Sequence, residues 1–231
     1  MKPRVKIHGF IIFVAVVLIV VLPDIFFRSN TASFYDIGLE IVGIALILLG
    51  QIFRVASRGY KSVYSKSGGA LIQNGPYAFV RNPMYLGIIL IGFGMVMLLF
   101  RWWAIILFLF IFGMIYLRLI RQEEAKLLKV FSKEYSAYCK KVPAIIPSMN
   151  SLLRNDIATY LPMRPVWIKK EIGAIIAVLS VAILLKLWQD CRSAGPGVYF
   201  LKLSAVLAVF LLFTGIVLYL LKRTDAPEKN T

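Results

Sequence analysis

The chain has 231 residues, of which 60% are hydrophobic, and a mean hydropathy of +0.80, which excludes an ordinary soluble domain. Its formal net charge of +16 would suit a nucleic-acid-binding protein. However, the basic residues are divided among the segments between long apolar blocks and form no single stripe, so no nucleic-acid partner is expected. With one histidine and no zinc-type cysteine spacing, no metal is expected either.

Long apolar blocks alternate with polar segments along the whole chain. A helix needs roughly 17–25 apolar residues to cross the hydrocarbon core of a bilayer. Six blocks lie within or just below this range: Ile7–Phe27, Ile37–Phe53, Met84–Phe100, Trp102–Leu119, Ile172–Leu187 and Val198–Leu221. The sequence therefore predicts an all-α, polytopic membrane protein with about six transmembrane helices.

The distribution of basic residues predicts the orientation of these spans. Of the 27 Lys and Arg residues, 22 lie in the terminal segments and in alternate loops, all on one predicted side of the membrane. The positive-inside rule then places both termini and the polar loops of the middle region in the cytoplasm. We expect three parts: an N-terminal transmembrane hairpin (1–50), a middle module (51–150), and a linker with a C-terminal transmembrane hairpin (151–231).

A polar loop rich in turn-forming residues runs directly into the third apolar block. Gly75-Pro76 predicts a turn, and Asn82-Pro83 predicts an extended residue followed by a helix with proline in its first turn. Arg81 and Asn82 would then lie at a helix N-terminus, where free backbone N–H groups favour an anionic ligand. The loop is a candidate ligand site.

The aromatic and glycine residues near this loop leave two interpretations open. Tyr77 and Tyr85 could stack on a planar ligand ring or anchor the membrane interface. Gly92 and Gly94, within the third block, permit close approach of either a ligand or a neighbouring helix.

Adjacent carboxylates follow the fourth apolar block. Glu123 and Glu124 should be solvent-exposed unless they meet partners. One could accept hydrogen bonds from ribose hydroxyls or an ammonium group while the other pairs with Arg118 or Arg121. The alternative is a solvated helix start with an Arg121–Glu124 contact.

An amphipathic helix is predicted after the fourth block, lying on the cytoplasmic face of the membrane. Its lysines would meet anionic headgroups and its apolar face could roof a pocket that opens towards the lipid. The apolar positions are Ile120, Leu127, Leu128, Phe131, Tyr135 and Tyr138.

Several short motifs, in this order, resemble those of the membrane methyltransferase superfamily, which includes isoprenylcysteine carboxyl methyltransferases and phospholipid N-methyltransferases. They are Gly75-Pro76-Tyr77, Arg81-Asn82-Pro83-Met84-Tyr85-Leu86-Gly87, Arg121 with Glu123-Glu124, Glu134-Tyr135 with Tyr138, and Val142-Pro143 with Pro147. The resemblance covers residues 51–149. It implies S-adenosylmethionine bound at the cytoplasmic face and a lipophilic methyl acceptor that enters from the bilayer.

Carried over to this sequence, the resemblance assigns roles to individual residues. The candidate catalytic residues are Arg81, Asn82 and Glu124. The candidate cofactor-binding residues are Gly75, Tyr77, Arg81, Asn82, Pro83, Tyr85, Leu86, Gly92, Gly94, Glu123 and Glu124. The candidate substrate-binding residues are Tyr135 and Tyr138.

Three other functions are weighed against an isoprenylcysteine-type enzyme. Asn82-Pro83 stands where isoprenylcysteine enzymes usually have His-Pro, and the form seen here is more frequent in phospholipid N-methyltransferases. A membrane NADPH-dependent reductase and a non-catalytic membrane scaffold are the remaining alternatives. The methyl reaction implied is an in-line displacement, which chiefly requires alignment of donor and acceptor and exclusion of water.

Overall fold

The computed structural model describes residues 21–28, 34–65, 69–148 and 160–193, with single positions at 208, 211, 215 and 219. Within these residues the chain is helical, with one isolated antiparallel bridge between Phe27 and Phe100 and no strand. The predicted all-α class is confirmed for this part of the chain. Nearly all of the predicted first and last spans lie outside the described residues.

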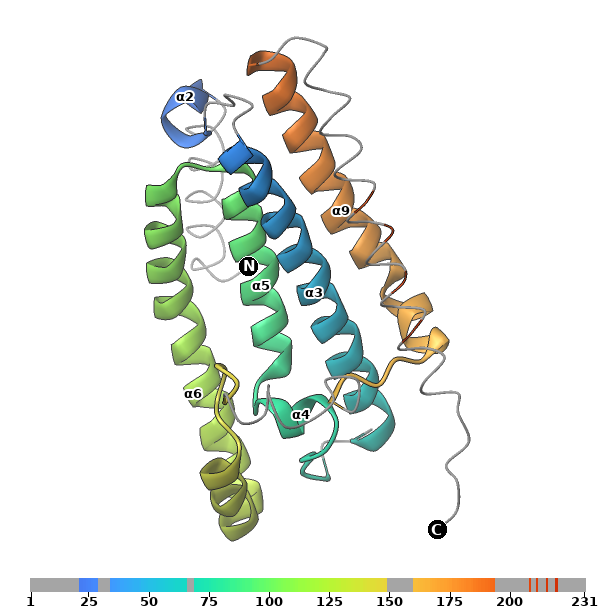
Figure 1. The fold of residues 1–231 in the computed structure, drawn as a ribbon. Helices are drawn as coiled ribbons and strands as arrows, with labels where there is room; N and C mark the ends of the chain where they lie inside the picture. Colours follow the sequence, from blue (N-terminus) through green and yellow to red (C-terminus); the bar gives the residue numbers. More distant parts are fainter. Residues whose placement is uncertain are drawn as a thin grey trace, which may run out of the picture.

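Four long helices lie side by side, and in Figure 1 they follow the order α6, α5, α3, α9 across the molecule. The bounds are α2 Pro23–Phe26, α3 Phe34–Tyr64, α4 Pro76–Phe79, α5 Pro83–Leu99, α6 Trp102–Lys141 and α9 Pro165–Ser193. Short α4 lies at the lower end of the bundle, where α3 ends and α5 begins (Figure 1).

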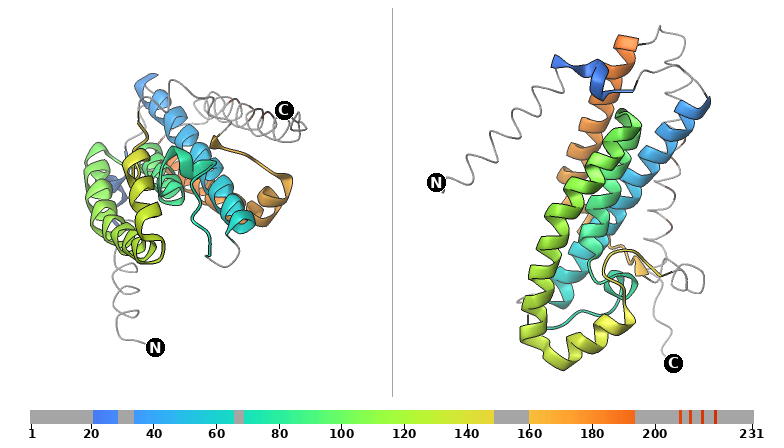
Figure 2. Two further views of the ribbon diagram at one scale, coloured as in Figure 1. Left: turned by 90° about the horizontal axis from the view of Figure 1, so that it is seen from below. Right: turned by 90° about the vertical axis from the view of Figure 1, so that its left-hand side faces the viewer.

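Two of the described helices, α3 and α6, are long and apolar enough to cross a membrane, and α5 is apolar but shorter. The predicted number of six spans therefore stays a prediction. Helix α3 continues eleven residues past the predicted end of its span at Phe53, to Tyr64. The predicted fourth span and amphipathic helix are also one element, α6, interrupted at Ser132 (φ 37°, ψ −106°). After Ser132 the helix turns back beneath the bundle (Figure 2, right).

Facing glycines bring α3 and α5 into close contact. A Cβ atom on Gly50 would lie 2.6 Å from the carbonyl oxygen of Gly87, and one on Gly43 would lie 2.8 Å from that of Gly94. On each helix the two glycines lie two helical turns apart, so the close contact occurs twice along the antiparallel pair α3 and α5. This packing fixes the start of α5, and with it the polar loop, against α3.

An apolar cluster at the lower end holds α3, α4, α5 and α9 together. Its buried members are Ile52, Phe53, Val55, Ala56, Phe79, Val80, Leu86, Leu161, Met163 and Trp167. Gly59 lies against the Trp167 ring, which brings α9 close to α3.

The opposite end of the bundle contains a buried ionic cluster. Arg28 Nε lies 3.3 Å from Asp36 Oδ1, and Arg28 Nη2 lies 3.8 Å from Glu40 Oε1. Lys186 Nζ of α9 lies 2.8 Å from the same Glu40 oxygen. These contacts join the end of the α2 segment, the start of α3 and the end of α9.

Candidate functional site

The loop before α5 is held in place by its own backbone. Gly75 adopts a positive φ of 60° and packs against the Tyr60 ring, and α4 begins at the next residue. The amides of Arg81 and Asn82 donate to the carbonyl oxygens of Pro143 (2.8 Å) and Ala144 (3.1 Å). The segment after α6 therefore occupies these two N–H groups, and anion binding at this helix N-terminus stays a prediction.

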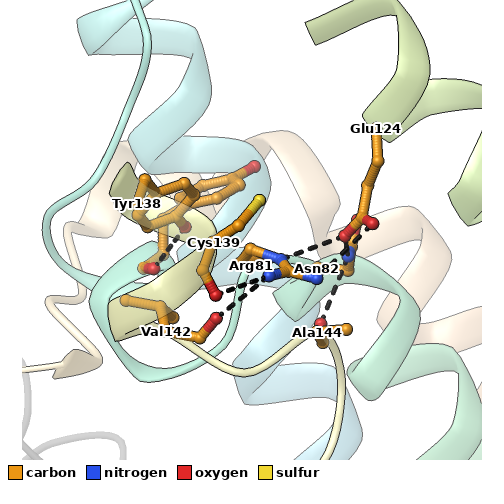
Figure 3. Close-up of polar contacts among 8 residues, drawn as sticks. Arg81, Asn82, Glu124, Tyr138, Cys139, Val142 and Ala144 are labelled. Carbon is orange, nitrogen blue, oxygen red and sulfur yellow. Dashed lines mark hydrogen bonds and ion pairs between the residues drawn. The ribbon is translucent and has the colours of Figure 1, made fainter. Parts of the chain in front are cut away.

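Arg81, Asn82 and Glu124 form one hydrogen-bonded group (Figure 3). Arg81 donates from Nε to Glu124 Oε1 (3.1 Å) and from Nη2 to Oε2 (3.4 Å), and Asn82 Nδ2 donates to Oε1 (3.0 Å). Such two-point, charge-assisted contacts are the strong kind of hydrogen bond. Glu124 therefore pairs with a residue 43 positions away, in place of the Arg121 contact that the sequence offered as an alternative.

The Arg81 guanidinium also ties the loop to the end of α6. Its Nη1 donates to the carbonyl oxygens of Cys139 (3.0 Å) and Val142 (3.3 Å), and Asn82 Nδ2 donates to that of Ala144 (3.2 Å), as Figure 3 shows. Guanidinium has five N–H donors, and this arrangement engages four of them. Arg81 thus acts here as a clamp that positions other groups.

Two tyrosines fasten the same junction from the other side. The Tyr138 hydroxyl donates to the Tyr77 carbonyl oxygen at 2.6 Å, and Tyr138 is only 4% exposed. Burial raises the pKa of both Tyr138 and Tyr77, so both hydroxyls stay protonated in the neutral range. These residues lie in α4 and in the part of α6 after Ser132, outside the apolar spans.

A pocket of about 210 Å³ opens between α3, the loop and α6. It is lined by Lys61, Ser65, Ala70, Leu71, Ile72, Tyr77, Arg81, Asn82, Pro83, Met84, Tyr85, Glu123, Leu127, Phe131, Tyr135 and Tyr138. Glu123 accepts a hydrogen bond from the Tyr85 hydroxyl (3.0 Å) and lies 4.0 Å from Lys61 Nζ. The Lys61 and Glu123 side chains are 53% and 43% exposed, so the pocket contains a cationic and an anionic side chain that are only loosely paired.

The structure separates the predicted site residues into those in the pocket and those elsewhere. Eight line it: Tyr77, Arg81, Asn82, Pro83, Tyr85, Glu123, Tyr135 and Tyr138. Glu124 lies behind them, against Arg81 and Asn82.

The four remaining candidates pack elsewhere. Gly92 lies against the Phe108 ring and Gly94 against the Gly43 backbone, which agrees with the helix-packing interpretation. Gly75 makes the turn beside Tyr60, and Leu86 belongs to the apolar cluster.

Lys61 is the charged pocket residue that the sequence reasoning missed; the uncharged residues Ser65, Ala70, Leu71 and Ile72 of the lining were not predicted either. The signal for Lys61 is present in the sequence: Arg54, Arg58 and Lys61 follow the second apolar block at helical spacings of four and three. This pattern indicates that the helix continues past the apolar block. The apolar face of α6 predicted to roof a pocket lines this one in part: Leu127, Phe131, Tyr135 and Tyr138 do so, whereas Ile120 and Leu128 do not.

Comparison with known proteins shows which families the segment that contains this site is similar to. The model of the phospholipid methyltransferase family matches residues 39–134, which include Lys61, the polar loop and the acidic pair.

Two particular relatives are isoprenylcysteine enzymes. The chain is 32% identical over 123 residues to a protein-S-isoprenylcysteine O-methyltransferase of Schizosaccharomyces pombe, covering 52% of this chain and 50% of that protein. It is 28% identical over 154 residues to the enzyme of the same name from Saccharomyces cerevisiae, covering 63% and 64% respectively. The chain thus spans about half to under two thirds of these relatives' lengths. No solved structure matches it.

These matches confirm the resemblance that the motifs predict, to the superfamily of isoprenylcysteine and phospholipid methyltransferases. The enzyme class expected from the sequence is also the class of both relatives.

Proposed function

We propose that the chain is an integral membrane methyltransferase that uses S-adenosylmethionine to methylate a lipophilic acceptor, in the manner of isoprenylcysteine carboxyl methyltransferases. The observation that carries the proposal is the pocket between α3, the loop and α6. It combines an acid, a base and aromatic rings at the end of apolar helices, within the family-matched segment. Both relatives' names favour a prenylcysteine carboxylate as acceptor.

The donors and acceptors of the pocket fit the chemical groups of S-adenosylmethionine. Glu123 is suited to its ammonium group or ribose hydroxyls, and Lys61 to its carboxylate. Tyr77 and Tyr85 offer ring faces for adenine. Ligand pockets commonly measure about 300–1,000 Å³, so a bound nucleoside would extend past the open side between Lys61 and Glu123. When bound, the cofactor supplies a methyl group already activated by the sulfonium charge.

The protein's own contribution is then alignment and exclusion of water. The Arg81–Glu124 clamp holds the loop against the end of α6, while Leu127, Phe131 and Tyr135 give the pocket an apolar wall. A carboxylate acceptor is already a nucleophile and needs no base.

A phospholipid amine as acceptor is the second candidate, favoured by the family model that matches. A protonated amine must lose a proton before it can attack the methyl group, so this reaction needs a base. Glu123 would be that base, because it is the carboxylate that lines the pocket.

We further propose that the chain crosses the membrane six times with its termini and the pocket in the cytoplasm. Single cysteines at Ser65 and Ser148 should be labelled from the cytoplasmic side, and one at Ser33 from the outer side. Labelling of Ser65 from outside would contradict this orientation.

Calorimetry and methyl transfer on purified protein test the function. Wild type should bind S-adenosylmethionine and methylate a prenylcysteine analogue more readily than phosphatidylethanolamine or a small thiol. Glu123→Gln should weaken cofactor binding about tenfold or more, because a charge-assisted hydrogen bond is lost. Glu171→Gln, which alters a carboxylate paired with Arg58 on α9, is the matched control and should bind as wild type. Folded wild type that binds no cofactor, or Glu123→Gln with unchanged affinity, would contradict the proposal.

A further inference from the structure

A second concave site lies between α3 and α9, on the side of α3 away from α6 (Figure 1). It is an apolar groove of about 300 Å³ lined by Gln51, Ile52, Val55, Met163, Ile168, Ile172, Ile175, Ile176, Leu179, Ser180 and Ile183. None of these residues lines the pocket assigned to methyl transfer, so the groove is a separate feature.

Gln51 is the unusual member of this lining. Its side chain is buried, with 2% of the residue exposed, and no described residue accepts a hydrogen bond from its Nε2. An amide N–H enclosed by isoleucine side chains without an acceptor is destabilising. Nε2 is itself enclosed in this structure, so a ligand that brings a hydrogen-bond acceptor into the groove would remove this cost once the Gln51 side chain turns towards it.

The position of Gln51 relative to the predicted membrane boundary suits one class of hydrogen-bond acceptor. Helices α3 and α9 run antiparallel, with Gly59 beside Trp167 at one end and Glu40 beside Lys186 at the other. Gln51 lies two residues before the predicted cytoplasmic end of its span at Phe53. The ester carbonyls of membrane lipids lie at this boundary between hydrocarbon and headgroups.

The groove extends on both sides of that level: Val55, Met163 and Ile168 lie towards the predicted cytoplasmic end, and the remainder runs into the predicted hydrocarbon region. Its α9 wall runs through Ile172, Ile176 and Ile183, all of which are about half exposed. This wall suits an alkyl chain that follows the helix. A transmembrane helix would fill the groove less well chemically, because its own carbonyls are already hydrogen-bonded within the helix and offer Gln51 no acceptor.

We propose that this groove binds one acyl chain of an ester-linked membrane lipid, whose carbonyl oxygen accepts a hydrogen bond from Gln51 Nε2. The bound chain fills the space between α3 and α9 and thereby stabilises their contact. This site is independent of the methyl-transfer pocket and does not require the acceptor or the cofactor.

Paired lipids that differ only in the carbonyl group test the hydrogen bond. Native mass spectrometry of the full chain would compare a diacyl phosphatidylglycerol with its dialkyl ether analogue of equal chain length. Wild type should bind the ester roughly tenfold more tightly, the scale set by leaving a buried donor unpaired. Gln51→Leu should lose the preference and still bind both lipids. Equal affinities in wild type, or an ester preference retained in Gln51→Leu, would overturn the proposal.

A photo-reactive residue identifies what occupies the groove in a membrane. Placed at Ile176, which is 56% exposed, it should capture the ester lipid in preference to the ether lipid. Placed at Ile106 of α6, which is 62% exposed and outside the groove, it should capture both equally. Capture of residues 198–221 of the chain at Ile176, in place of lipid, would overturn the proposal. Cofactor affinity, measured in the same Gln51→Leu protein, should equal that of wild type, which separates this test from that of the proposed function.

Discussion

The two ends of the bundle both contain charged side chains, but they use them differently. At the upper end, Arg28, Asp36, Glu40 and Lys186 are buried together, with side-chain exposures of 6–15%. At the lower end, Arg81 and Glu124 are similarly enclosed (14% and 21%), yet Glu123 beside them is 43% exposed and faces a pocket.

The difference shows how a structural charge can be told from a ligand-binding one. Buried, mutually satisfied ions are strongly constrained and have little capacity left for a ligand. Glu123 and Glu124 are neighbours in sequence, but only Glu123 retains an oxygen towards open space and a loose partner in Lys61. We therefore propose the binding role for Glu123, the less well-paired member of the acidic pair.

Breaking the upper cluster should have the largest effect on stability. Glu40→Gln removes a charge that lies 2.8 Å from Lys186 and 3.8 Å from Arg28, leaving buried cations with less compensation. Removing one partner of a buried pair costs roughly 3–5 kcal/mol. Thermal unfolding in detergent should show this loss, while cofactor affinity of the protein that remains folded should be unchanged. A variant as stable as wild type would mean that the cluster does not hold α9 on α3.

At the lower end, Glu124→Gln should reduce both stability and methyl transfer. The amide keeps the shape but loses the charge that binds Arg81 and Asn82, and bonds of this kind contribute about 1.5–3 kcal/mol.

Because Glu124 acts through Arg81, the double variant Arg81→Gln/Glu124→Gln should cost clearly less than the sum of the single variants. Unfolding free energies and KM against kcat for all three proteins give the coupling. Strictly additive losses would show that Glu124 acts independently of Arg81.

At the lower end, the sequence predicted the helices and the loop better than it predicted which charged side chains pair. The helical class, the loop at the start of α5 and the apolar face that lines the pocket follow from local patterns, because hydrophobic periodicity and proline position act over a few residues. The Arg81–Glu124 pair joins residues 43 positions apart, so no local spacing predicts it. The partners that the sequence suggested for the acidic pair, Arg118 and Arg121, are both within six residues of it.

Gly92 and Gly94 illustrate a second limit. Glycine permits close approach without specifying what approaches, so the sequence left both a ligand and a neighbouring helix open. The partner of Gly94 is Gly43 on a helix that precedes it by a long loop, and only the register of α3 against α5 determines this.

Alanine at the glycine contacts should separate packing from cofactor binding. Gly94→Ala would bring a methyl group against the Gly43 backbone, which cannot move aside as a flexible side chain would. Overpacking of this kind costs typically 1–3 kcal/mol. Gly87→Ala should cost a similar amount, but because Gly87 lies near the loop it should also weaken cofactor binding. Gly38→Ala, where a Cβ would meet nothing within 4 Å, is the control and should leave stability unchanged or slightly improved.

Gly94→Ala is the sharper of the two tests. Thermal unfolding and cofactor titration on the folded protein provide both readouts. A loss of cofactor affinity in Gly94→Ala without a loss of stability would show that Gly94 contributes to cofactor binding.

The smallest expected effect concerns Tyr138, which joins the end of α6 to α4 beside Arg81. Tyr138→Phe leaves the Tyr77 carbonyl oxygen without its 2.6 Å hydrogen bond, at a cost of about 0.5–1.5 kcal/mol. Burial raises the pKa of Tyr138 in the folded protein. The protonated hydroxyl therefore stabilises the fold fully at pH values below about 10, the ordinary pKa of a tyrosine. That contribution is lost as the pH rises through the folded-state pKa.

Unfolding measured from pH 7 to 11 should therefore show a constant difference between wild type and Tyr138→Phe at the lower values and a shrinking one above pH 10. A difference that grows with pH would mean that the hydroxyl ionises more easily in the folded protein than in the unfolded chain. The junction between Tyr77 and Tyr138 would then be open to water, and the closed lower end inferred from burial would be wrong.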